Sequence, residues 1–485
     1  MESSRRVSRR QRCARSCPGT KIDLQFVNVK PDDQDQRTET RAIIRANAAH
    51  FHWRHNRPPQ DKSKLKQSGH GAVSRHDERI TCPLLPMQST QLGTDVDPFS
   101  SYNCDFPRTF VNHCIAFNAQ VILPALFPDG ANNFNVRASM MQISTSNPCV
   151  LHMFITGALI NSQGTLGATP SNRISFDMFR SRAEIVRHMS IAMKDPVEAC
   201  KDINIFAIVA LAKTGTFHRV EMPLKTPKQG PLRSLQLLNL LALSEIDPIH
   251  FDGLSKLIEL KGGLEKIEIP GLAALISLRG GLLVGTRDCT APRFPVVTLS
   301  CPTREFIYQG QGMGFCTDQD LYMVLSMLNS YTIMIDDFCE GRKVVTASVL
   351  IDHRNTTQHA LLSLPPRVGV SECCRLAALI YSLLVTFPLP YSAAPFKCLV
   401  TRLKIALTEW DGDDQMLVWV LTMGGIGATG LGERGWFVKS LQGAVTRIGV
   451  RSWIEARDII KRGLWYESTN DGDGQGLWLE SRIAD

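Results

Sequence analysis

Apolar positions recur every three or four residues in segments that begin near Asp97, and breaks rich in Gly, Pro and Asn separate these segments. Such spacing places apolar side chains along one face of a helix. It predicts helices near residues 178–193, 202–213, 232–243, 247–261, 271–284, 318–329, 371–387, 414–423, 435–447 and 451–462. No strand-like alternation extends over several segments, and no clear repeat of about 20–50 residues is present. The pattern therefore predicts an all-α, multi-helix domain.

The segment that follows Asp247 carries the clearest helix signals. Asp247 offers a side-chain N-cap, and Pro248 suits the first helical position, where a backbone N–H would have no partner. Leu254 and Leu257 then fall on one face of the helix. Gly262 can adopt the left-handed conformation that ends many helices. The sequence therefore predicts a helix bounded by Asp247 and Gly262.

One long apolar stretch raises the question of a membrane span. The 21 residues from Leu376 to Phe396 carry no charge. Pro388 and Pro390 interrupt them, so residues 376–387 are the longest part that can form one helix. These are about 12 residues, against the ~20 that a membrane span requires. The stretch therefore predicts a buried core helix and no membrane partner.

The two ends of the chain differ in amino-acid composition from the middle. In residues 1–95, Ser, Arg, Gln, Asp and Lys dominate and aliphatic residues are sparse, so little apolar surface is available for burial. This composition predicts a mostly disordered region with one short helix near 37–51. A helical domain is expected over residues 96–467. The Asn-, Asp- and Gly-rich residues 468–485 are predicted to form a flexible tail.

The formal net charge of +8 originates at the start of the chain. Residues 1–80 hold 18 Lys+Arg and 9 Asp+Glu. The rest of the chain holds 36 Lys+Arg and 37 Asp+Glu, so it is nearly neutral. A basic segment beside a neutral body is typical of a nucleic-acid-binding arm, a nuclear-import signal or a solubilising tail, and all three interpretations stay open. The candidate phosphate contacts to DNA or RNA are Arg41, Arg45, Arg54, Arg57, Lys62, Lys64 and Lys66.

A zinc module that reads DNA is not expected in this basic segment. Cys13 and Cys17 lie four residues apart, and the next cysteine is Cys82. A binuclear zinc cluster needs six thiolates within a short segment, because two tetrahedral metal ions share them. The three histidines within residues 50–55 have no acid or thiol close by in the sequence. No metal site is therefore predicted.

The strongest pattern for a cofactor is Gly425–Gly430, which fits the G-x-G-x-x-G turn of dinucleotide-binding proteins. Only 55 residues follow Gly430, too few to complete a doubly wound sheet, and no β-α-β pattern precedes it. A corner between two helices explains these glycines better, and a nucleotide-binding enzyme that uses this loop is the distant alternative. The zinc-protease, serine-hydrolase and phosphate-loop patterns are missing too, so the sequence predicts neither an enzyme nor a cofactor.

Several short segments follow one another in an order and spacing that a known family shares. They are Phe26–Val29, the basic stretch Arg41–Arg57, Asp97–Phe99 with Tyr102, His250–Leu254, Glu259–Leu264, Ala291–Pro295, Glu372–Ala377, Trp419–Gly425 and Glu433–Phe437. This series resembles the fungal-specific transcription factor domain proteins of ascomycetes, in particular the branch labelled "tachykinin family". The resemblance is poor over residues 140–240. It also fails at Ser277–Leu282, where the family has a more polar segment with an aromatic residue.

The resemblance implies an all-helical regulatory domain, residence in the nucleus and a role in transcription. Many members of the wider family carry an N-terminal zinc cluster that reads DNA, and this sequence has none. The expected regulator therefore acts through partners more than by reading a DNA sequence directly. Its expected partners are other regulatory proteins, a homo- or heterodimer partner, and DNA held by the basic segment. The family supplies no catalytic residues, and a helical adaptor or scaffold protein that does not bind DNA is the main alternative.

Overall fold

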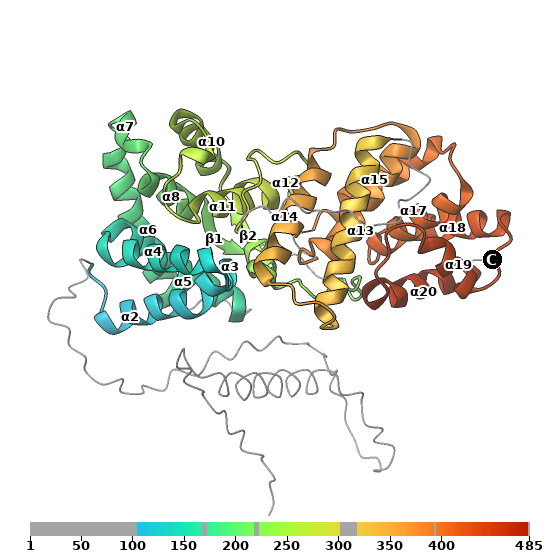
Figure 1. Ribbon diagram of the computed structural model, residues 1–485, viewed down its shortest axis with the longest axis horizontal. Helices are drawn as coiled ribbons and strands as arrows, with labels where there is room; N and C mark the ends of the chain where they lie inside the picture. Colours follow the sequence, from blue (N-terminus) through green and yellow to red (C-terminus); the bar gives the residue numbers. More distant parts are fainter. Residues whose placement is uncertain (1–103, 167–171, 218–222, 301–317, 392–393, 484–485) are drawn as a thin grey trace, which may run out of the picture. The chain divides into compact units, whose positions relative to one another are not determined.

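The computed structural model describes residues 104–166, 172–217, 223–300, 318–391 and 394–483 (Figure 1). The chain divides into two units, Met1–Pro83 and Leu84–Asp485, and every described residue belongs to the second unit. The predicted disordered region, its short helix near 37–51 and the basic residues within it lie outside the described part of the chain.

Helices make up nearly all the regular structure of the described residues (Figure 1). The elements before residue 300 are α2 (Arg108–Phe117), the π-helix η1 (Asn118–Ile122), α3 (Leu123–Leu126), α4 (Ala131–Ser146), α5 (Pro148–Leu166), α6 (Asn172–Ala192), α7 (Pro196–Ala199), α8 (Asp202–Leu211), β1 (Lys213–Phe217), the 3-10 helix η2 (Leu235–Leu237), α9 (Leu238–Leu241), β2 (Ser244–Ile246), α10 (Pro248–Lys261), the 3-10 helix η3 (Leu264–Lys266), α11 (Leu272–Ile276), the π-helix η4 (Ser277–Leu283) and α12 (Val284–Asp288). The elements after residue 318 are α13 (Gln319–Cys339), α14 (Ala347–Ser363), α15 (Gly369–Tyr381), the π-helix η5 (Ser382–Thr386), α16 (Phe396–Ala406), the 3-10 helix η6 (Leu407–Glu409), α17 (Asp414–Gly427), α18 (Arg434–Arg447), α19 (Trp453–Ile460) and α20 (Glu467–Ile483). The predicted all-α class is confirmed, with one two-stranded antiparallel sheet added by β1 and β2.

Helix α10 has the boundaries that its capping residues predict. The Asp247 side chain accepts hydrogen bonds from the backbone N–H groups of Ile249 (2.9 Å) and His250 (3.3 Å). At the other end Gly262 has a φ of 96°, which a residue with a Cβ rarely adopts. Local sequence chemistry is therefore sufficient to define this helix.

The helix predicted over residues 232–243 is wrong. The chain there forms only η2 and α9, because Gln236 and Leu237 have left-handed φ angles of 59° and 56°. The buried Arg354 side chain stabilises this turn by donating a hydrogen bond to the carbonyl oxygen of Leu235 (2.8 Å) and another to Gln236 Oε1. A distant residue on α14 thus overrides the local helical pattern.

The flexible tail predicted over residues 468–485 is also wrong, because residues 467–483 form α20. Its glycines permit close packing: a Cβ on Gly474 would lie 2.7 Å from the ring of Trp465. The Trp465 indole N–H donates to Asp471 Oδ1 (2.7 Å), and Leu477 is fully buried. Packing contacts therefore offset the low helix propensity of glycine in this segment.

Two helical stretches of the described chain are long and apolar enough to cross a membrane by length and composition: Arg108–Leu126 and Gly369–Thr386. The bent pair Asn132–Ser146 and Pro148–Ser162 would add a third if it formed one span. The helical stretch Gly369–Thr386 contains all but the last residue of the predicted core helix 376–387, and with 18 residues it is longer than that prediction. Of its apolar window, 78% is buried inside the domain, as a core helix requires.

The candidate site lies among elements that the middle of the chain brings together. Helix α5 packs against α6 and α8, and α10 packs against α8. Helix α11 continues through η4 into α12, and η4 contacts α14. Strand β1 follows α8 and strand β2 precedes α10, and residues of the sheet, α8, α10 and η4 line one cavity.

Candidate ligand-binding site

None of the seven basic residues predicted to contact phosphates can be placed. Arg41, Arg45, Arg54, Arg57, Lys62, Lys64 and Lys66 all lie outside the described residues. Their proposed contact with nucleic acid stays a prediction from charge.

The glycines of the G-x-G-x-x-G pattern are packing residues in the structure. Gly425 and Gly427 lie inside α17, and Gly430 follows the end of that helix with a φ of 79°. A Cβ on Gly427 would lie 2.9 Å from Ile380. The C-terminal end of a helix carries a partial negative charge and presents no free N–H groups to a phosphate. These glycines therefore do not form the strand-to-helix turn of a dinucleotide-binding protein, and the predicted helix–helix corner between α17 and α18 is confirmed.

Gly425→Ala is expected to lower the free energy of unfolding by about 1–3 kcal/mol, because overpacking a buried contact strains the core. The added methyl group would lie 2.4 Å from Leu477 Cδ2 on α20. Gly443→Ala is the matched control, since this exposed position on α18 has its nearest neighbour, Arg447 Nη1, 3.9 Å from the added Cβ. The control is expected to gain about 0.5–1 kcal/mol from helix propensity. Chemical denaturation followed by circular dichroism measures both, and equal stability of the two variants would contradict the packing of α17 on α20.

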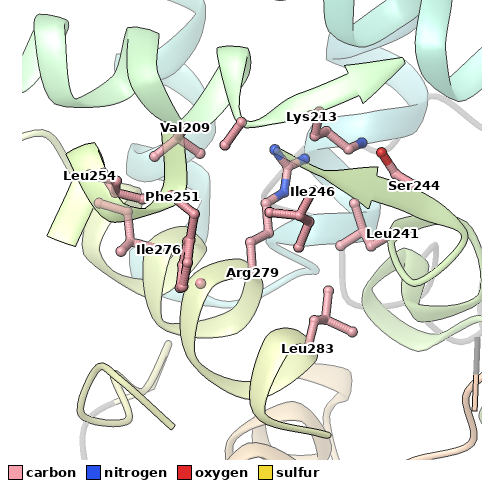
Figure 2. A pocket seen from close by; sticks show the side chains of 12 residues that line it. Val209, Lys213, Leu241, Ser244, Ile246, Phe251, Leu254, Ile276, Arg279 and Leu283 are labelled. Carbon is pink, nitrogen blue, oxygen red and sulfur yellow. The ribbon is translucent and has the colours of Figure 1, made fainter. Parts of the chain in front are cut away.

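The chemically most unusual part of the described chain is a cavity bordered by the small sheet. Figure 2 shows Lys213 and Ser244 extending from the strands and Arg279 extending from η4 toward them. The other walls come mainly from apolar side chains of α8, α10 and η4. The lining residues are Val209, Ala212, Lys213, Leu241, Ser244, Ile246, Phe251, Leu254, Ile276, Arg279, Gly280 and Leu283.

A second cavity shares both cations with the first. Lys213 and Arg279 line it together with residues of η1, α3, α5 and α8. Thr156 of α5 lies on its wall, and this side chain is 1% exposed. The Thr156 hydroxyl has no hydrogen-bond partner in the structure. Thr156 thus adds a polar group without a partner to the wall of the second cavity.

Neither of the two cations has a partner among the residues that the structure describes. Lys213 is 7% exposed, and neither a hydrogen bond nor an ion pair of its amine is found within the described chain. The Arg279 Nε atom is buried and has no partner either. Buried polar groups in native proteins almost always bond to something, and buried charges are paired or bind a ligand. The pair therefore requires an explanation that packing alone does not provide.

Other cations that are buried or partly buried in the described chain do have partners. Arg375 Nη2 lies 2.7 Å from Glu372 Oε1, Lys261 Nζ lies 2.8 Å from Asp202 Oδ1, and Arg434 Nε lies 2.7 Å from Glu480 Oε2. The fold can thus supply carboxylates to cations that serve structure. Within the described residues neither Lys213 nor Arg279 has such a carboxylate, and neither has the neutral acceptors that hold the buried Arg354, so these two are candidates for binding an external anion.

Local structure holds the two cations in place. Arg182 of α6 donates hydrogen bonds to the carbonyl oxygens of Leu211 (3.0 Å) and Lys213, which fixes the start of β1. Arg279 lies within the π-helix η4, and short π-helical segments are frequent at functional sites. The next residue, Gly280, leaves room for the Phe251 ring, which would lie 2.9 Å from a Cβ there.

The pKa shifts of Lys213 and Arg279 favour the binding of an anion. Burial lowers the pKa of Lys213 well below its usual value, and the positive charge of Arg279 lowers it further. Burial also lowers the pKa of Arg279 to about 10. A nearby anion stabilises the charged form of a base, so its binding would raise both pKa values again.

The groups around the two cavities are those of an anion-binding site. No group of three or more His, Cys, Asp or Glu residues that could hold a metal ion occurs in the described ranges. The lining of the two cavities contains two basic side chains, hydroxyls, amides and apolar groups.

Sequence reasoning missed this site, although one signal was present. Arg279 is the charge inside Ser277–Leu282, the stretch that departs from the family pattern, and Lys213 directly follows the apolar run of α8. Comparison with known proteins finds no match for this chain among protein-family models, curated proteins or solved structures. The assignment of the site therefore rests on its geometry.

Proposed function

We propose that this protein is a regulator of transcription, of the fungal-specific transcription factor-like class, whose helical domain binds a small anionic effector. Its place of action is the nucleus. It reaches genes through partner proteins, assisted by phosphate contacts of the basic N-terminal segment, and it has no catalytic role.

The observation that carries the effector role is the pair of cations on the walls of two cavities, Lys213 and Arg279, for which the described part of the chain supplies no partner. An enclosed space with mostly apolar walls and a few convergent polar groups is the usual form of a small-molecule site. The transcriptional role is supported by the sequence resemblance, and the observed all-helical architecture agrees with what that resemblance implies.

Binding of random duplex DNA across a salt series tests the role of the basic segment. The full-length protein is expected to bind with a steep salt dependence, of slope about −6 if all seven basic residues contact phosphates. A chain that begins at Asp95 lacks these residues and is expected to lose binding. Fluorescence anisotropy at 50–300 mM salt measures both proteins.

The opposite result favours the adaptor alternative. If neither protein binds DNA at low salt, the direct contact is excluded and the protein acts through partners alone. One surface supports that alternative: Phe176 and Phe179 on α6 are 63% and 71% exposed, and exposed aromatic residues are typical of contact surfaces.

A further inference from the structure

We infer that the effector is a small organic carboxylate, whose acid group lies at Lys213 and Arg279 and whose hydrocarbon part occupies the apolar space beside them. This inference rests on the proposed effector-binding function and adds the chemical class of the ligand. It is carried by the unpaired groups, the size of the two cavities and the character of their walls.

The size of the cavities limits the ligand to a few heavy atoms. The space open to the centre of a water molecule is about 30 Å³ in the first cavity and about 70 Å³ in the second. One water molecule needs roughly 10–15 Å³ by this measure. By this measure the first cavity holds about two to three groups of that size and the second about five to seven. These volumes suit an acid of about four to six carbons that lies across the shared cations, and they are small for a nucleotide or coenzyme.

The donors favour a carboxylate over a phosphate. A guanidinium presents parallel N–H groups that match the two oxygens of a carboxylate, and the Lys213 amine adds a second charge. The Thr156 hydroxyl can donate one more hydrogen bond. A phosphate has more oxygens to satisfy, and such sites usually add backbone N–H groups at a helix N-terminus or glycine-rich loop. Here η4 presents Arg279 from mid-helix, between α11 and α12, where backbone N–H groups are already bonded.

The walls favour a ligand with a hydrocarbon part. Phe251 and Leu254 of α10, Ile246 of β2 and Leu283 of η4 border the first cavity. An inorganic anion would leave these surfaces dry and without contacts. A short alkyl chain would contact them, at a gain of roughly 0.8 kcal/mol for each CH₂ group taken from water.

The test is thermal unfolding of the full-length protein with a graded series of acids at constant ionic strength. Acetate, butyrate, hexanoate and decanoate vary the length, hexanamide removes the charge, and inorganic phosphate and sulfate remove the hydrocarbon. Butyrate and hexanoate are expected to raise the Tm in a saturable manner. Hexanamide and decanoate are expected to leave it unchanged, because the first lacks the charge and the second exceeds the space.

Two variants locate the site. Lys213→Met and Arg279→Met are each expected to weaken hexanoate binding by about tenfold to a hundredfold, as the loss of one charged hydrogen-bond partner predicts. Lys256→Met is the matched control, because this lysine of α10 is 63% exposed, pairs with Glu259 and belongs to neither cavity lining. Isothermal titration calorimetry measures all four proteins, and circular dichroism confirms that each variant is folded.

The outcomes separate the ligand class from the proposed function. A Tm rise with phosphate or sulfate alone, lost in both variants, would overturn the carboxylate and leave an anionic effector in place. Hexanoate binding that both variants retain would overturn this site. No Tm shift with any of the acids or inorganic anions would remove the effector role as well, while DNA binding by the basic segment would be judged separately by the salt series.

Discussion

Glu372→Gln is expected to lower the free energy of unfolding by about 3 kcal/mol, since breaking a buried ion pair leaves one charge uncompensated. The side chains of Glu372 and Arg375 on α15 are 11% and 5% exposed. Glu372 accepts hydrogen bonds from Arg375 Nε (2.8 Å) and Nη2 (2.7 Å), from Arg402 Nη2 (3.3 Å) and from the backbone N–H of Arg367 (2.9 Å). Glutamine has one acceptor oxygen in place of two and would turn an N–H group toward the guanidinium.

The matched control is Glu259→Gln on α10. Glu259 also pairs with a cation three residues away, Lys256 at 2.9 Å, but it is 71% exposed. Exposed pairs contribute about 0–1 kcal/mol, so this variant is expected to be nearly as stable as the wild-type protein. Urea denaturation at neutral pH compares the two substitutions, and an equally small loss for both would show that the Glu372 pair is not buried in solution.

The effect of Glu372→Gln also depends on pH. Burial raises the pKa of Glu372, but hydrogen bonds from Arg375 and Arg367 and the charges of Arg375 and Arg402 outweigh it and lower the pKa below its usual value. The carboxylate therefore stabilises the fold fully above its unfolded pKa of about 4.3, and this contribution is lost as the pH falls through the lower folded value. The stability difference between the wild-type protein and Glu372→Gln should shrink below about pH 4.

Elements with local signals could be predicted from sequence, and elements that depend on distant contacts could not. Helix α10 has its N-cap, its apolar face and its terminal glycine within one segment, so its boundaries follow from the residues alone. Helix α14 was missed because its buried face carries Asp352, Arg354, Asn355 and Gln358, which conceal the hydrophobic period. Helix α20 was missed because its glycines are compatible with a helix only when other helices pack on them.

The candidate site could not be predicted because it is defined by two cations, Lys213 and Arg279, that have no carboxylate partner among the described residues. Arg279 stands in an apolar run and Lys213 at the end of another, which sequence reasoning treats as helix interior and helix end. Whether each cation meets a carboxylate depends on the packing of α8, η4 and the sheet, as Lys261 meets Asp202. Conflicts between local chemistry and burial are expected at functional sites, where stability is exchanged for binding.

Lys213→Met is expected to raise the free energy of unfolding of the ligand-free protein by about 1–3 kcal/mol, because replacing a buried charge by an apolar side chain of similar volume removes its desolvation cost. The same change at Lys261 is the control. This lysine is also largely buried, at 18% exposed, but it pairs with Asp202 at 2.8 Å. Lys261→Met would leave that carboxylate without its counter-charge, so it is expected to destabilise the protein by about 1–3 kcal/mol.

The pH dependence distinguishes this charge effect from simple improved packing. The folded pKa of Lys213 is lowered, chiefly by burial, so between that value and the unfolded value of about 10.4 the unfolded chain binds more protons than the folded one. Wild-type stability should therefore rise with pH across this window, and the advantage of Lys213→Met should be largest below it and vanish near pH 10.4. Urea denaturation of both proteins between pH 6 and pH 10 measures the difference.

A Lys213→Met protein that is less stable than wild type throughout would mean that the lysine has a structural partner in solution. A stability advantage that stays constant with pH would assign the gain to packing. An advantage that disappears as the pH rises is the signature of a charge that the fold retains at a cost, as a group kept for binding an anion requires.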